Sequence, residues 1–162
     1  GNECAIKKLA NFYRQYTKCI NTNYQFTDLI SASLVKYSIN TFLATKVIFF
    51  NELFEVFNNS ETQDNWKNFI KIIKNDKRIG DSHMQVPGPD GRLGFGGPCF
   101  PKDTKALLKY SKDVGKPLNL LEKCISINNN IRSQYNSLSQ RETEQNINFD
   151  SNMPDNKNEG TK

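Results

Sequence analysis

Apolar side chains recur at spacings of three and four along most of the chain, which is the period of an α-helix packed on one side. The pattern predicts five helices, over residues 3–20, 29–57, 64–74, 103–112 and 118–135. Asn2 and Asp28 precede the first two and can cap them, because short side chains with an oxygen acceptor bind free amides at a helix start. No stretch shows convincing strand alternation, so the predicted fold class is all-α.

The second predicted helix, residues 29–57, has apolar residues around nearly its whole circumference, which is typical of a helix buried on most sides. Lys36, Lys46 and Glu52 are among the polar residues that interrupt it, so it lacks the run of ~20 apolar residues that a membrane span needs. At 1.5 Å per residue it would be roughly 43 Å long, which exceeds the width of a small domain. We therefore expect one side to meet a partner subunit or a neighbouring domain.

A long Gly/Pro-rich loop, residues 76–102, separates the third and fourth predicted helices. Six of the nine glycines and four of the six prolines lie between residues 80 and 101, and no regular element tolerates that density. Loops of this length are usually functional or disordered, and interspersed aliphatic and aromatic residues favour order. Gly94, Gly96 and Gly97 would let the backbone approach a ligand or adopt positive φ. A purely structural loop is the alternative.

Cys99 is a candidate nucleophile. It lies just before the helix predicted to begin at Asp103 and is close in sequence to Arg92 and Lys102. A helix N-terminus and nearby cations both stabilise a thiolate. The alternative is a buried structural thiol, which is the role predicted for the remaining cysteines, Cys4, Cys19 and Cys124.

Other polar residues each have a functional and a structural interpretation. Lys36 and Asn40 are four residues apart and share a helix face, where they need polar partners or a polar cavity. Alternatively, the lysine reaches solvent and the asparagine bonds locally. Asp103 is interpreted structurally as an N-cap, Arg78 as a charge at a helix C-terminus, and His83 as a loop histidine.

Composition predicts a helical domain over residues 1–136 and a disordered polar tail over residues 137–162. The mean hydropathy is −0.67, and the tail holds few large apolar groups to offset ordering entropy of roughly 1–2 kcal/mol per residue. The net charge is +5, with +7 in the first 136 residues. That excess suits a phosphorylated ligand, although a solvated basic surface is the simpler interpretation.

Several classes of protein are not indicated. The four cysteines show no Cys-x-x-Cys spacing and there is one histidine, so no metal site is expected. No aromatic or arginine cluster suggests nucleic-acid binding, and no secretory signal or membrane segment is recognisable. The expected location is cytoplasmic.

Three blocks together carry a resemblance to a known family: VKYSINTFLATKVIFFNE (35–52), NDKRIG (75–80) and VPGPDGRLGFGGPCFPKDTKALL (86–108). In order and spacing they resemble the central domain of the UDP-glucose/GDP-mannose dehydrogenase family, over about residues 3–135. The VPGPDG variant is most similar to UDP-glucose 6-dehydrogenase-like members. The resemblance implies a four-electron oxidation of the C6 alcohol of a nucleotide sugar, with two NAD. The most similar reaction is the conversion of UDP-glucose to UDP-glucuronate.

The resemblance also implies roles for individual residues. Cys99 would form a thiohemiacetal and then a thioester, Lys36 would stabilise the oxyanion, and Asn40 and Asp103 would position or activate water. The implied substrate-binding residues are Lys36, Asn40, Arg78, Gly88, Arg92, Phe95 and Gly96. Cys99 and Lys102 would lie near the nicotinamide. Arg78 would reach the substrate of the other subunit, and the long helix would form a homodimer.

The sequence also departs from the family. It has no strand followed by G-x-G-x-x-G, so we expect the NAD-binding domain, with the glutamate that it contributes to catalysis, and the nucleotide-binding third domain to be absent. Pro98 replaces a small or polar residue beside the nucleophile and removes one N–H. The expected function is therefore a catalytic segment that is inactive alone. A non-catalytic helical dimerisation module or remnant is the alternative.

Overall fold

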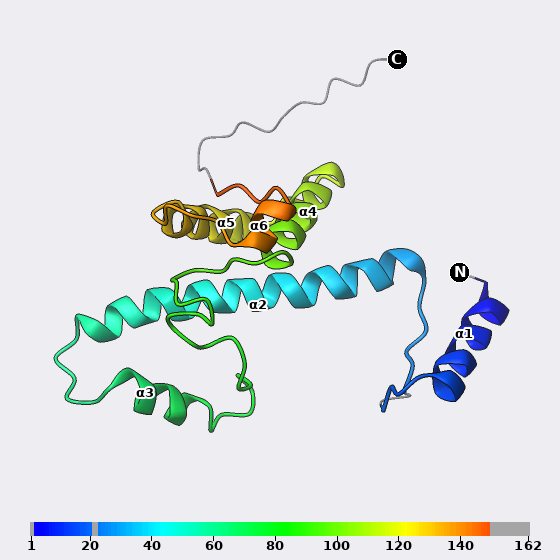
Figure 1. Cartoon of the computed structure of the whole chain (residues 1–162), viewed down its shortest axis with the longest axis horizontal. Coiled ribbons are helices and arrows are strands. Elements are labelled where there is room, and N and C mark those ends of the chain that lie inside the picture. Colours follow the sequence, from blue (N-terminus) through cyan, green and yellow to red (C-terminus); the bar gives the residue numbers. More distant parts are fainter. Residues whose placement is uncertain (1, 21–22, 150–162) are drawn as a thin grey trace, which may run out of the picture. The chain divides into compact units, whose positions relative to one another are not determined.

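The computed structural model describes residues 2–20 and 23–149 (Figure 1). Within these ranges all regular structure is helical and no strand occurs, which confirms the all-α class. The described helices are α1 (Glu3–Tyr16), α2 (Leu29–Asn58), α3 (Trp66–Ile73), α4 (Phe100–Asp113), α5 (Asn119–Arg132) and α6 (Gln140–Glu144). The chain divides into two compact units, one ending at Tyr37 and the other beginning at Ser38.

The predicted caps of the first two helices are confirmed. The Asn2 side chain accepts hydrogen bonds from two amides in the first turn of α1. One Asp28 carboxylate oxygen accepts from the amides of Ile30 and Ser31 at 2.9 Å each. α1 ends at Tyr16 rather than at residue 20, because Thr17 is already extended, with φ −122° and ψ 160°.

The long helix is confirmed, but its predicted burial on most sides is wrong for the chain on its own. Ile39, Phe42, Phe49 and Val56 are between 55% and 68% exposed. These residues are spaced by three, seven and seven positions, so they form one stripe on the helix, which we call the α2 stripe. The described part of the second unit leaves this stripe uncovered.

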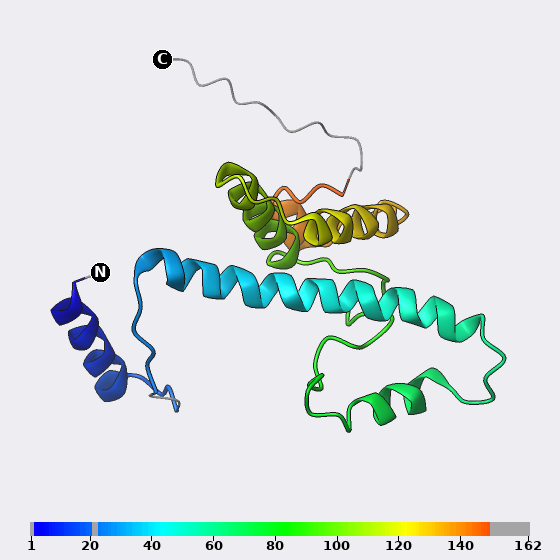
Figure 2. The same ribbon diagram turned by 180° about the vertical axis from the view of Figure 1, so that it is seen from behind.

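The second unit has two hydrophobic clusters, both built on α2. Ala44 and Ile48 pack with Phe95 and Cys124 in the first cluster. The second cluster consists of Phe50, Ile70, Met84 and Val86. Figures 1 and 2 show the corresponding arrangement, in which α4 and α5 lie on one side of α2 and α3 lies on the other. The Gly/Pro-rich loop contributes to both clusters and is therefore ordered by the core.

The boundaries of α3, α4 and α5 differ from the predicted ones for local reasons. α3 begins at Trp66 because Asn65, rather than Asp64, caps it. α4 begins at Phe100, three residues early, since Pro101 suits a first turn in which no N–H is needed. Cys124 on α5 is buried as predicted.

The prediction of disorder from residue 137 onward is wrong for residues 137–149, which we call the C-terminal arm. Ser139 and Glu142 form a capping box that begins α6. Ile147 and Phe149 are buried, so the few apolar residues of this segment reach the core. The prediction failed because it counted apolar groups and overlooked the capping signal S-x-x-E. Residues 150–162 lie outside the described residues.

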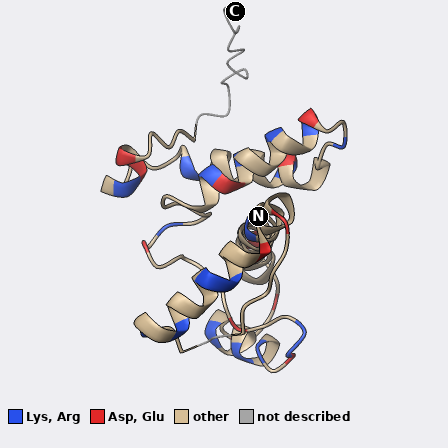
Figure 3. Cartoon of the chain, turned by 90° about the vertical axis from the view of Figure 1, so that its right-hand side faces the viewer, with Lys and Arg blue, Asp and Glu red and all other residues tan. Residues whose placement is uncertain are grey.

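None of the described helices combines the length and apolar character that crossing a bilayer requires. α1, α4 and α5 carry both basic and acidic residues, whereas α3 carries Lys67 and Lys71 and no acidic residue (Figure 3).

Candidate active site

Cys99 occupies the N-cap position of α4 and is exposed. Its carbonyl oxygen accepts a hydrogen bond from the amide of Asp103 at 2.8 Å. Asp103 therefore lies within the first turn of α4 rather than before it, and its interpretation as an N-cap is wrong. The thiol sits where the free amides of a helix start favour negative charge.

The Asp103 carboxylate is buried, with 1% of the residue exposed. One oxygen accepts a hydrogen bond from the Asn40 side-chain amide at 2.6 Å, and the other lies 3.1 Å from the Lys102 ammonium. Asn40 thus bonds across the fold rather than locally, which overturns the local alternative. A buried carboxylate needs such partners, because an unpaired charge away from water is costly. Two predicted site residues, 63 positions apart in sequence, are therefore brought together.

Lys36 belongs to the first compact unit, where its ammonium lies 5.1 Å from the centroid of the Tyr37 ring. Its role beside Cys99 stays a prediction.

The predicted substrate loop is held by side chains of the chain itself. Its amides from Leu93 to Gly97 are bonded at four positions, by acceptors on α2, on α5, just after α5 and on the C-terminal arm. The pairs are Leu93 with the Tyr135 hydroxyl (2.9 Å), Gly94 with Asn51 (2.9 Å), Phe95 with Asn128 (2.7 Å) and Gly97 with Glu142 (2.9 Å). The loop backbone is therefore fixed without a ligand.

Two loop glycines are required by packing within the chain. A Cβ on Gly96 would lie 2.2 Å from both Arg132 Nη2 and Glu142 Oε1. Gly94 has φ +72°, and a Cβ there would lie 2.7 Å from Asn128 Oδ1. The Phe95 side chain is buried in the first cluster. The structural interpretation thus accounts for these three residues, and a substrate role for Phe95 and Gly96 stays a prediction.

An ion-paired network lies behind this loop. Arg132 donates to Glu142 Oε1 at 2.9 Å and to Asp90 Oδ2 at 2.8 Å. Burial opposes ionisation of Glu142, but the amides of Ser139 and Gly97 and the charge of Arg132 outweigh it, so the pKa of this carboxyl is lowered from 4.5.

Sequence reasoning missed this network, although two signals were present. Asn128 and Arg132 continue the inward spacing of Leu121 and Cys124 on α5. Polar residues at inward helix positions indicate a buried network. Residues 139–142 carry the capping-box pattern.

Gly88 and Arg92 form the base of the loop. The Gly88 amide donates to the Arg92 carbonyl at 2.8 Å. The Arg92 guanidinium donates to the Ser137 carbonyl at 2.6 Å and lies 5.1 Å from the Tyr135 ring centroid. It is therefore directed to the C-terminal arm and not, as expected, toward Cys99.

Arg78 lies on the surface, with 89% of its side chain exposed. Its Nε donates to Asp76 Oδ1 at 2.9 Å. Hydrogen bonds from Arg78 lower the pKa of Asp76. Because α3 ends at Ile73, Arg78 pairs with Asp76 and does not serve as a charge on the helix C-terminus.

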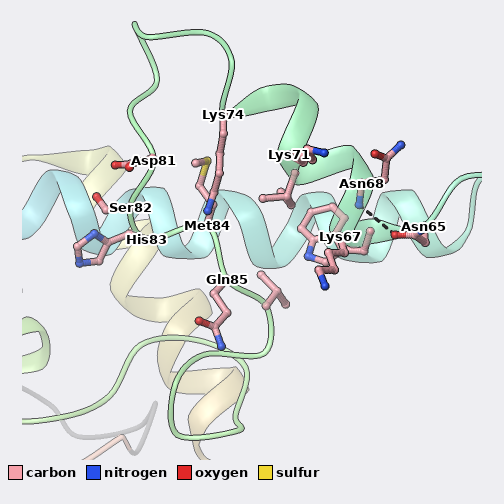
Figure 4. Close-up of a pocket in the computed structure, with 13 residues that line it drawn as sticks. Asn65, Lys67, Asn68, Lys71, Lys74, Asp81, Ser82, His83, Met84 and Gln85 are labelled. Carbon is pink, nitrogen blue, oxygen red and sulfur yellow. Dashed lines mark hydrogen bonds between the residues drawn. The ribbon is translucent and has the colours of Figure 1, made fainter.

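A cavity of about 990 Å³ lies between α3 and residues 81–86 (Figure 4). Lys67, Lys71 and Lys74 line one side, and His83 and Met84 line the other. Burial and the nearby Lys46 lower the pKa of His83. Cys99 and Asp103 are not among the lining residues, but the His83 ring centroid lies 5.5 Å from that of Phe100, the residue after Cys99.

The model of the UDP-glucose/GDP-mannose dehydrogenase family, central domain, matches residues 30–130. The chain therefore belongs to this family, and the matched region contains Asn40, Cys99 and Asp103. UDP-glucose 6-dehydrogenase YwqF of Bacillus subtilis is 33% identical over 126 residues, which is 78% of this chain and 27% of that protein. TuaD of the same organism, also a UDP-glucose 6-dehydrogenase, is 37% identical over 102 residues, which is 63% of this chain and 21% of that protein.

A UDP-glucose 6-dehydrogenase of Rickettsia bellii is 42% identical over 102 residues, covering 63% of this chain and 22% of that protein. The chain thus spans about a quarter of the length of the curated relatives that it matches.

Proposed function

We propose that this chain supplies the central catalytic segment of an NAD-dependent UDP-glucose 6-dehydrogenase, which oxidises the C6 alcohol of UDP-glucose to a carboxylate. The observation that carries the proposal is the pairing of the buried Asp103 carboxylate with Asn40 at 2.6 Å, one helical turn from the exposed Cys99. Family membership and the UDP-glucose 6-dehydrogenase relatives support the choice of substrate. A cytoplasmic location stays a prediction.

The proposed chemistry proceeds through Cys99. Loss of a hydride and a proton converts the C6 alcohol to an aldehyde, and the Cys99 sulfur then adds to the aldehyde carbon to give a thiohemiacetal. Loss of a second hydride from that carbon, with loss of the hydroxyl proton, leaves a thioester. Water adds to the thioester carbon, the carbon–sulfur bond breaks, and the carboxylate is released with the thiol restored. The covalent step divides one difficult oxidation into easier ones.

Asn40, Asp103 and Lys36 are proposed to assist these steps. The Asp103 carboxylate can accept a proton from the attacking water, and Asn40 holds that carboxylate in place. Lys36 would offset the negative charge that develops on the substrate oxygen.

The hydride acceptor is NAD. Cys99 is exposed and the Lys102 side chain is 52% exposed, so a nicotinamide can approach both from outside this domain. These two residues are the ones that we propose lie beside it. The described residues contain no strand and hence no dinucleotide-binding sheet, which supports binding of most of the NAD molecule by another polypeptide region. Each of the two oxidations would use one NAD molecule, which would accept one hydride.

The α2 stripe supports a homodimer in which two long helices pair. Its four residues are apolar and more than half exposed, and burying such a surface is favourable. In this dimer the exposed Arg78 of one chain would reach the substrate of the other. Gly88 and Arg92 would lie near the sugar diphosphate.

The same stripe also favours a second candidate, a non-catalytic helical dimerisation module. This candidate is consistent with the internal contacts made by Arg92, Phe95 and Gly96.

A chimera separates the two candidates. Residues 3–149, which include the C-terminal arm, replace the corresponding segment of YwqF, and NADH is measured on addition of UDP-glucose and NAD. The proposal predicts NADH production by the chimera, its loss in the Cys99→Ala variant, and its retention in the Cys19→Ser control, which alters another exposed cysteine. The isolated 162-residue chain is expected to produce none. A chimera that dimerises yet yields no NADH would favour the dimerisation module.

A further inference from the structure

Arg132 and Glu142 form the centre of the network that holds the loop, and both are closed off from water. Their side chains are 1% and 0% exposed, respectively. Glu142 Oε1 accepts from Arg132 and from the Gly97 amide, both at 2.9 Å, and Oε2 accepts from the Ser139 amide at 2.7 Å. A buried ion pair is favourable only when its remaining hydrogen-bonding sites are filled in this way.

The network connects three parts of the chain that are distant in sequence. Arg132 ends α5, Glu142 lies on α6 in the C-terminal arm, and Asp90 and Gly97 belong to the loop. The Arg132 guanidinium also lies 5.4 Å from the Phe149 ring centroid. This contact anchors the arm. Gly96 lets the loop pass directly against the ion pair, because any Cβ would overlap both charged groups.

The geometry links the ion pair to Cys99. Gly97 is two residues before Cys99, and Pro98 between them has a restricted φ. Fixing the Gly97 amide on Glu142 therefore limits the orientation with which the chain enters α4 at Cys99. Charged partners make stronger hydrogen bonds than neutral ones, so Gly97 is the most firmly held of the four bonded amides.

We propose that Arg132 and Glu142 are positioning residues, which act through the Gly97 amide to fix the loop and the thiol of Cys99. The proposal rests on the function proposed above insofar as it concerns Cys99. It assigns a role in the site to the C-terminal arm, because Glu142 comes from that arm. As positioning residues, Arg132 and Glu142 do not contact the reacting atoms.

The test separates positioning from a contribution to stability. In the full chain, Arg132→Met with Glu142→Leu replaces the buried pair by apolar residues of similar size, an exchange that is often neutral or favourable for stability. The matched control is Glu144→Gln, an exposed glutamate on the same short helix. Amide hydrogen exchange at Gly97 is followed by NMR, alkylation of Cys99 by mass spectrometry, and folding by thermal unfolding.

The double variant is expected to fold but to melt below the native chain, because the Ser139 and Gly97 amides lose their acceptor. We also expect the Gly97 amide to exchange about tenfold faster or more and Cys99 to alkylate about threefold more slowly. The control should match the native chain in all three. A folded double variant with Gly97 exchange and Cys99 alkylation within about twofold of native would overturn the proposal. If the double variant does not fold, Glu142→Gln, which keeps the size and removes the charge, decides by the same two readouts.

The outcomes for the two proposals are distinguishable. A native chain in which Cys99 reacts no faster than Cys19 contradicts the proposed function. The exchange of Gly97 in that same chain still decides whether the ion pair fixes the loop.

Discussion

Replacing Gly96 by alanine should destabilise the fold strongly because of one close approach. The added Cβ would lie 2.2 Å from Arg132 Nη2 and from Glu142 Oε1, whereas ordinary contacts begin near 3.4 Å. Both side chains have to move by about 1 Å, which disrupts their 2.9 Å bond. Breaking a buried pair costs about 3–5 kcal/mol when one partner is removed, and we expect about 3 kcal/mol here because both partners remain.

The assay is urea unfolding of the native and variant chains. Gly97→Ala is the matched control, since Gly97 has φ +73° and no atom within 4 Å of its added Cβ. It should cost about 1–2 kcal/mol from backbone conformation alone. In a Glu142→Ala background the clash with Oε1 is gone and Arg132 keeps its bond to Asp90, so the cost of Gly96→Ala should fall to about 1 kcal/mol.

The steric reasoning would be refuted if Gly96→Ala cost no more than Gly97→Ala, or if its cost were the same with and without Glu142.

Three further predictions concern other contacts. Asn40→Ala should lower the free energy of unfolding by about 1.5–3 kcal/mol, because the buried Asp103 carboxylate loses the donor at 2.6 Å; urea unfolding at pH 7 that matches the native chain would contradict this. Since the pKa of Glu142 is lowered from 4.5, its contribution to stability is complete above that pH and is lost as the pH falls below it. Between pH 7 and pH 3 the free energy of unfolding should therefore fall less steeply for Glu142→Gln than for the native chain. Phe42→Glu, on the α2 stripe, should shift sedimentation from dimer to monomer with unchanged helicity, and an unchanged dimer would exclude pairing through this face.

Local signals in the sequence were sufficient for most of the helices. Spacing and the caps Asn2 and Asp28 located the first two starts, because a cap interacts only with its own first turn. The start of α4 was missed because Asp103, a good capping residue, outweighed Pro101.

Non-local features could not be predicted in the same way. The bond between Asn40 and Asp103 joins residues 63 positions apart, and no local pattern specifies such a pair. The ordered arm at Ile147 and Phe149 depends on where α5 and the loop leave room for two side chains. The resemblance identified Cys99 and its partners as candidates, whereas the pairing of Arg132 with Glu142 is seen only in the folded chain.

Relative alkylation rates of the cysteines at pH 7 show whether Cys99 is an activated nucleophile. Cys4, Cys19 and Cys99 are all exposed, so access alone predicts similar rates. Cys4 also lies in the first turn of a helix, which makes it the matched control. Burial raises the pKa of Cys124, so this thiol should react only on unfolding. Cys99 should react about tenfold faster than Cys4 and Cys19, and equal rates for the three exposed thiols would contradict its role as the nucleophile.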